Sequence, residues 1–260
     1  MKMKKLSTIL VLCVCCVSFC AAEEYKFDTP EAWYNAEQFK KDGNRIIVTG
    51  QKWMIGRKLI KLPENTSIDT LKVSGIFRAV EGSKNNTMYI GFKVYDKKRR
   101  EMRYVNLHPV VGSDTVLIAA AQKGDKIIMV ADASKWLKNQ IPVTGAKADL
   151  SDLPNYNTLP AAVNIEKSGD VWKITLRTPL KTDIAKDTAI RQHRAGAHLY
   201  YAFLQTKTGS SGILKPVNQK KLWPHIAYVR FLVLANWKGG DAQLELIDPK
   251  VIVLDPAEKK

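Results

Sequence analysis

Beyond residue 44, hydrophobic and polar residues alternate with a period of two in one short segment after another. Between residues 70 and 80, Leu71, Val73 and Phe77 share one face, whereas Lys72 and Ser74 share the other. Alternation of this kind is typical of a strand with one buried face and one solvated face. The predicted strands span residues 45–50, 70–80, 87–96, 102–108, 114–120, 126–132, 161–167, 171–177, 227–237 and 242–254.

Many short strands separated by glycine-containing turns, with almost no helical periodicity, predict an all-β protein. The expected architecture is a two-sheet antiparallel β-sandwich of the jelly-roll type. A single sandwich domain over residues 45–257 accounts for all of these strands. Within it, the proline-containing segment 131–160 is expected to form an irregular insertion loop.

A short N-terminal helix is expected within residues 23–44, ahead of the sandwich. Thr29 suits the N-cap, Pro30 suits the first helical position, and Gly43 suits the end of the helix. We therefore assign this segment to a helical lead-in.

The first 22 residues have the pattern of a secretory signal peptide. Three lysines precede an apolar run from Leu6 to Phe19, and the small residues Ala21 and Ala22 precede Glu23. The apolar run is too short to span a membrane comfortably. We expect cleavage near Ala22 and a secreted or periplasmic protein without a transmembrane segment.

The cysteines of the chain are confined to this signal segment, at Cys13, Cys15, Cys16 and Cys20. The mature chain is then expected to have no disulfide, no cysteine nucleophile and no thiolate zinc ligand. Phe19 stands directly before Cys20, where a lipoprotein signal carries a small residue, so lipid attachment is not expected. Stability must then come from the hydrophobic core, for which a chain of about 238 residues is long enough.

The chain is strongly basic, with 41 Lys and Arg against 25 Asp and Glu. Without the three signal lysines 38 basic residues remain, and 38 minus 25 gives a net charge of +13. Outside the cytoplasm nucleic acid is not an expected partner, and acidic polysaccharides or an anionic envelope surface are favoured. The alternative interpretation is that the lysines only keep the surface soluble.

The segment AIRQHRAGAHLYYAF, residues 189–203, holds two of the four histidines. If Ala195 and Gly196 form a two-residue hairpin turn, one polar group of side chains shares a sheet face, while Phe203 points to the core. The residues of that polar group are Arg191, His193, His198 and Tyr200. A slip of the turn by one residue would separate them.

Four interpretations of this cluster remain open. In a binding site, Arg191 would hold a carboxylate or sulfate, the histidines would bond hydroxyls, and Tyr200 would stack on a sugar ring. In a polysaccharide lyase, Arg191 would neutralise a uronate while a histidine removed the C5 proton and Tyr200 acted as the acid. A zinc site lacks a third ligand, and Arg191 would repel the metal. The cluster is otherwise an ordinary solvated sheet face.

Two tryptophans at strand ends are candidate secondary contacts for a ligand. Trp223 stands before Pro224 at a strand entry, and Trp237 stands just before the loop at Gly239. Trp136 is expected to anchor the insertion loop on the core. No catalytic residue is assigned. No cofactor is assigned either, because the acids that a structural calcium would need are scattered. Those acids are Asp96, Asp114, Asp132, Asp152 and Asp248.

Two stretches resemble jelly-roll carbohydrate-binding modules of the galactose-binding-like type. LKVSGIFRAVEGSKNNTMYIGFKVYDKKRR, residues 71–100, is similar to their early strands, and AYVRFLVLANWKGGDAQLELIDPKVIVLD, residues 227–255, is similar to their closing hairpin. The resemblance implies glycan binding on a concave sheet face or at loop tips, often with a structural calcium. We therefore expect a non-catalytic protein that binds a polysaccharide, preferably an anionic one. The alternatives are a jelly-roll polysaccharide lyase and an envelope structural or interaction protein without a sugar site.

Overall fold

The computed structural model describes residues 22–64, 66–68, 70–216 and 223–254. The expected signal peptide, with all four cysteines, lies outside the described residues apart from Ala22. The described chain is all-β and its sheets are antiparallel, which confirms this part of the predicted fold class. No helix of the described residues is both long and apolar enough to cross a membrane.

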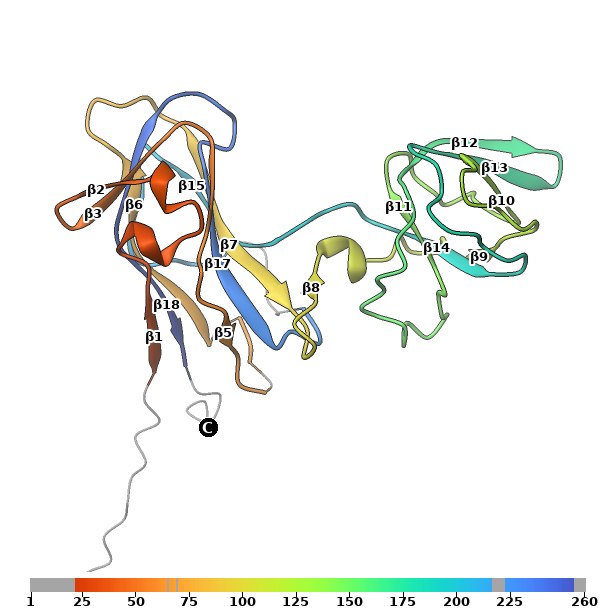
Figure 1. Ribbon diagram of the computed structural model, residues 1–260, viewed down its shortest axis with the longest axis horizontal. Coiled ribbons are helices and arrows are strands. Elements are labelled where there is room, and N and C mark those ends of the chain that lie inside the picture. Colours follow the sequence, from red (N-terminus) through yellow and green to blue (C-terminus); the bar gives the residue numbers. More distant parts are fainter. Residues whose placement is uncertain (1–21, 65, 69, 217–222, 255–260) are drawn as a thin grey trace, which may run out of the picture.

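The larger part of the molecule consists of two six-stranded sheets that face each other (Figure 1). The first sheet has the order β16 (Ser210–Ile213), β6 (Leu71–Ala79), β18 (Gln243–Val253), β3 (Arg45–Thr49) and β2 (Lys40–Asp42), with β1 (Glu23–Lys26) also paired to β18. The second has the order β15 (Leu199–Gln205), β7 (Thr87–Tyr95), β17 (Tyr228–Ala235) and β4 (Lys52–Ile55). Two short strands complete it, β5 (Ile60–Lys61) on β17 and β8 (Glu101–Met102) on β7.

The sandwich core follows from the alternation of apolar residues along these strands. In β6, Leu71, Val73 and Phe77 are fully buried, as the pattern predicts. The inward residues of β7 include Phe92, which packs edge-on against Tyr201 of the neighbouring strand β15. Successive side chains of a strand point to opposite faces, so the residues between the core positions form the outer face of each sheet.

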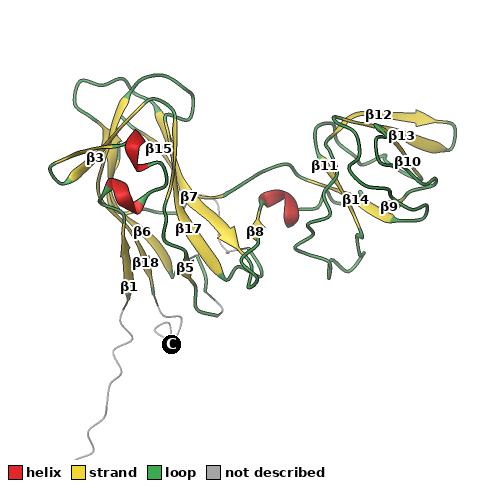
Figure 2. Cartoon of the chain, in the orientation of Figure 1, coloured by secondary structure: helices red, strands yellow, loops and turns green. Residues whose placement is uncertain are grey.

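The expected N-terminal helix is not formed. Two three-residue 3-10 turns stand there instead, η1 (Pro30–Ala32) and η2 (Ala36–Gln38), drawn as short coils in Figure 2. Between them Trp33 has an extended backbone and bridges to Gly56, and its ring is fully buried against Phe27 and Phe231. Burial of this ring in the sandwich core outweighs the weak helix signals at Thr29 and Pro30.

A second lobe, built from the chain between β8 and β15, lies apart from the sandwich in Figure 1. It contains two three-stranded sheets, β10 (Ile127–Val130) with β13 (Val171–Leu176) and β12 (Ala162–Ser168), and β11 (Ile141–Thr144) with β14 (Ala189–His193) and β9 (Thr115–Val116). It has a hydrophobic core of its own, made only from residues 117–190. Residues 45–257, expected to form one continuous sandwich, therefore contain two hydrophobic cores, and the chain segment that forms the second core is inserted between strands of the first.

The segment 131–160 is part of this second lobe. It contributes β11 to a sheet, so it is more ordered than the irregular loop that its prolines predict. Trp136 is buried and its Nε1 donates a hydrogen bond to the carbonyl of Ser113, as expected for an anchor on a core. Because that core belongs to the second lobe, Trp136 attaches segment 131–160 to the second lobe and not to the sandwich.

Two short stretches connect the lobes and lie side by side. Leaving β8, the chain passes through a 3-10 turn, η3 (Tyr104–Asn106), and it returns through residues 194–198. The Arg194 amide donates to the His108 carbonyl at 2.8 Å, and the Val105 amide donates to the Gly196 carbonyl at 3.4 Å. Tyr156 of the second lobe reaches back and donates its hydroxyl to Asp96 at the end of β7.

Candidate functional site

The hairpin predicted at Ala195 and Gly196 is not present. β14 pairs with β11 and β9 in the second lobe, whereas β15 pairs with β7 in the sandwich. Neither Ala195 nor Gly196 has the positive φ that a two-residue hairpin turn needs at one or both of its central positions. Gly196 instead lies against Tyr104, whose Cβ would be 2.8 Å from any Cβ added at this glycine. The segment therefore crosses between lobes, and the predicted pairing of Arg191 with Tyr200 is wrong.

Arg191 and His193 are fully buried in the second lobe and bond to each other. The Arg191 Nε donates to His193 Nε2 at 2.8 Å, and its Nη2 donates to Asp152 at 2.7 Å. His193 Nδ1 donates to the Val105 carbonyl at 2.6 Å. Burial, together with the charge of Arg191, lowers the pKa of His193, so the ring is neutral and holds the arginine in place. These side chains form an internal ion pair and do not reach a ligand surface.

Trp223 is also buried, as part of the sandwich core. Its ring contacts Tyr104 and His108 edge-on, with centroid distances of 5.9 and 5.7 Å, and those two rings stack on each other at 3.8 Å. The position closes the sandwich beside the connection to the second lobe. It does not present an exposed stacking surface of the kind predicted for this tryptophan.

The remaining predicted residues, His198, Tyr200 and Trp237, come together with three further rings on the outer face of the second sheet. We call this group the aromatic face. Its residues are Trp53, Tyr89, His198, Tyr200, Phe203 and Trp237. Trp53 is 47% exposed and Phe203 is 38% exposed, so the face combines ring contacts with solvent access.

Strand register explains why these rings meet. Phe203 of β15 lies opposite Tyr89 of β7, which lies opposite Leu234 of β17, which in turn lies opposite Trp53 of β4. Directly opposed residues have their Cβ atoms about 5 Å apart, so this row is continuous across four strands. Leu234 is 1% exposed although it points outward, because the aromatic side chains of the row cover it.

The next row contains Gly91, and this glycine lets the two sides of the face approach. A Cβ on Gly91 would lie 2.2 Å from the Leu199 carbonyl oxygen, which the bulge in β15 between Tyr200 and Ala202 brings close. β4 and β15 stand at opposite ends of the sheet order, yet the rings of Trp53 and His198 are only 5.4 Å apart. The two rings therefore reach across the strands between them.

The ring contacts make one connected surface. Tyr89 is central, at 5.2 Å from Tyr200, 4.8 Å from Phe203 and 5.6 Å from Trp237. Trp53 joins Trp237 at 6.2 Å. Contacts in this range stabilise aromatic pairs beyond simple area burial. The surface is therefore held in place before any ligand binds.

His198 is the polar group at the aromatic face. The residue is 6% exposed, and neither of its ring nitrogens has a hydrogen-bond partner within the described part of the chain. Burial lowers its pKa, with nearby Lys93 acting in the same direction. The ring is thus neutral at neutral pH and offers one donor and one acceptor. A buried polar atom without a partner costs about 1–3 kcal/mol.

Three of the six aromatic-face residues escaped prediction. Trp53 belongs to a four-residue strand too short to show alternation, and Phe203 faces outward because of the bulge. Tyr89 lies in a predicted strand, but its partners came from strands 110 or more residues away along the chain. No local pattern contains that information.

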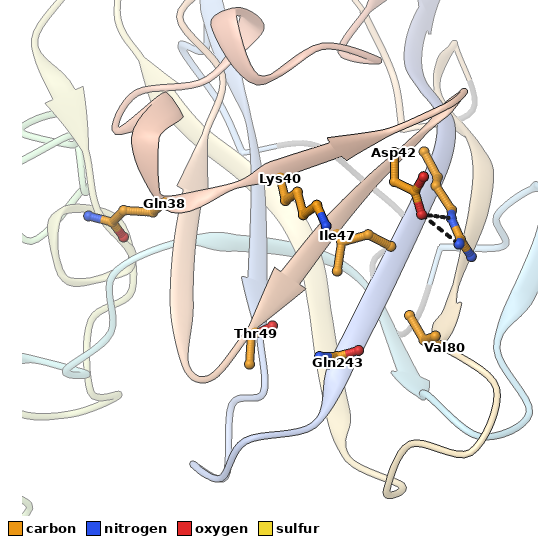
Figure 3. A pocket seen from close by; sticks show the side chains of 8 residues that line it. Gln38, Lys40, Asp42, Ile47, Thr49, Val80 and Gln243 are labelled. Atoms are coloured by element: carbon orange, nitrogen blue, oxygen red, sulfur yellow. Dashed lines mark hydrogen bonds and ion pairs between the residues drawn. The ribbon is translucent and has the colours of Figure 1, made fainter.

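The outer face of the first sheet also has a pocket, of about 250 Å³, shown in Figure 3. Its arginine is already paired, because Arg45 contacts both Asp42 and Glu245 at 2.7 Å. Glu245 is in turn contacted by the neighbouring Arg78 at 2.6 Å. Glu245 is 3% exposed, so this group is a neutralised ion network. It has less to offer a ligand than the aromatic face.

Asp96 and Asp152, two of the five acids considered for calcium, are bound by other side chains of the protein. Asp96 accepts from Arg100 and Tyr156, and Asp152 accepts from Arg191 and Asn155. Within residues 22–64, 66–68, 70–216 and 223–254, no group of three or more His, Cys, Asp or Glu is placed to hold a metal ion.

Comparison with known proteins leaves the function to be argued from this geometry. No family model matches the chain. Among curated proteins and solved structures, none matches it either. The resemblance to galactose-binding-like modules therefore stays a prediction.

Proposed function

We propose that the protein is a secreted, non-catalytic carbohydrate-binding protein that holds a polysaccharide on its aromatic face. The supporting observation is the connected, partly exposed surface of Trp53, Tyr89 and Trp237. Aromatic faces stack on the apolar C–H faces of sugar rings, and fixed donors and acceptors bond their hydroxyls. A rigid outward platform of this kind suits a long chain ligand.

The fold is consistent with this proposal. Several pairs of consecutive long strands are divided between the two sheets, as in β3 and β4, β6 and β7, and β17 and β18. We propose that this alternation is that of a jelly roll, the architecture of many sugar-binding modules. Export by the predicted signal peptide would bring the protein to polysaccharides outside the cytoplasm.

The lyase alternative loses the residue set on which it rested. It required Arg191 beside His193 or His198 and Tyr200, but the first two are enclosed in the second lobe and the last two lie on the sandwich. The envelope-protein alternative is an outcome of the binding test, in which a protein partner but no glycan would be retained.

The test is affinity electrophoresis of wild type and of Trp53→Ala in gels that contain soluble polysaccharides, acidic and neutral. Removal of a hot-spot tryptophan costs about 2 kcal/mol or more, so we expect retardation to weaken at least tenfold. Ile127→Ala is the matched control, because Ile127 is 42% exposed on the second lobe. If no polysaccharide retards the wild type, or if both variants lose retardation equally, the proposal is wrong.

A further inference from the structure

The outer face that carries the aromatic rings continues into a cluster of positive charge. On this outer side β7 carries Tyr89, Gly91 and then Lys93. The antiparallel strand β17 carries the residues opposite them, which in the same direction are Leu234, Leu232 and then Arg230. Lys93 and Arg230 are directly opposite each other in the strand register. Four residues of strand separate Arg230 from Leu234, a distance of about 13 Å.

Arg230 is held in a fixed position at this end of the face. Its guanidinium lies 5.1 Å from the ring centroid of Tyr34 and 5.9 Å from that of Tyr95. Its Nη1 donates to the Tyr34 hydroxyl and, at 2.8 Å, to the carbonyl of Arg57. Contacts with aromatic faces and a carbonyl orient the guanidinium without neutralising it.

A second guanidinium shares the same tyrosine. That of Arg57 lies 5.2 Å from the Tyr34 centroid, and its Nε donates to the Trp33 carbonyl at 2.8 Å. Within the part of the chain that the structure describes, neither Arg57 nor Arg230 forms an ion pair with a carboxylate. We call Arg57, Lys93 and Arg230 the cationic end.

The carboxylate that pairs with Lys93 does not balance this charge. Glu101 pairs with Lys93 at 2.9 Å and is approached by Arg103 at 3.8 Å, so it is already shared between two cations. Two arginines fixed around one ring without a counter-ion repel each other, and an anion placed between them would relieve that repulsion. The contrast is with Arg45 and Arg78 on the other sheet, which close on Glu245.

We propose that the cationic end binds the carboxylate or sulfate groups of an acidic polysaccharide whose neighbouring sugar rings lie on the aromatic face. The polymer then runs along β7 and β17, from Trp53 and Tyr89 towards Arg230. Guanidinium groups bind carboxylate and sulfate oxygens through paired N–H donors, while the strand spacing allows more than one sugar unit between the two ends. This inference rests on the proposed function and specifies the class of its ligand.

The experiment measures affinity for polysaccharide pairs that share a backbone and differ in charge. The pairs are polygalacturonate with its methyl ester, and dextran sulfate with dextran, which separate carboxylate from sulfate recognition. The variants are Arg57→Gln, Arg230→Gln and the double variant. Arg177→Gln on the second lobe removes the same charge from an exposed site away from the sandwich.

We expect the wild type to bind one acidic member at least tenfold more tightly than its neutral counterpart. The double variant should lose that preference, because its affinity for the acidic member weakens about tenfold while its affinity for the neutral member stays unchanged. The Arg177→Gln variant should bind both members as the wild type does. Arg57 is exposed, so Arg57→Gln alone keeps the test valid should Arg230→Gln fail to fold.

Three outcomes would overturn the inference. Equal affinity of the wild type for acidic and neutral members would refute it while leaving the proposed function standing. An equal loss in Arg177→Gln and in the double variant would show that only net charge matters. If no member of either pair binds and Trp53→Ala changes nothing in the wider panel, the proposed function fails with it.

Discussion

Arginine 191 shows how a residue suited to ligand binding is used instead inside the protein. Its guanidinium is completely buried and donates hydrogen bonds to Asp152, His193 and the Lys147 carbonyl. A buried charge of this kind is tolerated only while its partners remain in place. The same residue type on the sandwich surface, at Arg230, keeps an unneutralised charge.

Removal of the partner of Arg191 should therefore destabilise the second lobe. In Asp152→Ala the arginine is left buried without its 2.7 Å carboxylate, and we expect a loss of about 3–5 kcal/mol in the free energy of unfolding. Asp114→Ala is the control, because Asp114 is half exposed and 3.7 Å away, and should cost less than about 1 kcal/mol. Urea unfolding measures both, and equal losses would contradict this account.

At the scale of the element, the bulged strand β15 decides which way its side chains point. The bulge places both Tyr200 and Phe203 on the outer face, and the missing side chain of Gly91 leaves room for its backbone. The aromatic face is therefore a product of one irregularity in an otherwise regular sheet.

Gly91→Ala should disturb this strand more than its small size implies. The new methyl group would meet the Leu199 carbonyl at 2.2 Å, where backbone rather than a flexible side chain must move. We expect the free energy of unfolding, measured by thermal unfolding, to fall by about 1–3 kcal/mol. Hydrogen exchange at the amides of Tyr200 and Ala202 should become faster. Unchanged exchange in β15 would show that the strand accommodates the methyl group elsewhere.

The sequence predicts the long strands well and their long-range arrangement poorly. Alternation in β6, β7 and β18 is strong because each strand has one apolar side and one more polar side over nine or more residues. Gly196 is a residue type typical of turns, but here a glycine is needed because a side chain would collide with Tyr104. The local sequence does not distinguish a connection between lobes from a hairpin turn. Arg191 and His193, half of the predicted cluster, were therefore placed wrongly.

At the scale of the molecule, one β-sandwich carries a second lobe as an insertion with closely spaced ends. No composition change marks the insertion, because both lobes are built from the same alternating strands. The sandwich core takes no fully buried side chain from residues 108–198, although Tyr156 packs against it. The two cores are accordingly expected to fold separately.

Replacement of residues 108–194 by a short Gly-Ser linker should leave a folded sandwich. The hydrogen bond from the Arg194 amide to the His108 carbonyl shows that the two ends are within reach of such a linker. We expect a cooperative thermal transition, a β-type circular dichroism spectrum and retained polysaccharide binding. A shortened chain without a cooperative transition would show that contacts such as that of Tyr156 with Asp96 are essential.

The pairing of β1 with β18 has a mechanical consequence. Glu23 lies opposite Val253, so the two ends of the described chain leave the sandwich at the same edge. Force applied between them would separate β1 from β18 one hydrogen bond after another, and the exposed residues of β1 offer little packing to resist it. Under tension the sandwich would first release this strand, while the sheet that carries the aromatic face stays outside the line of force.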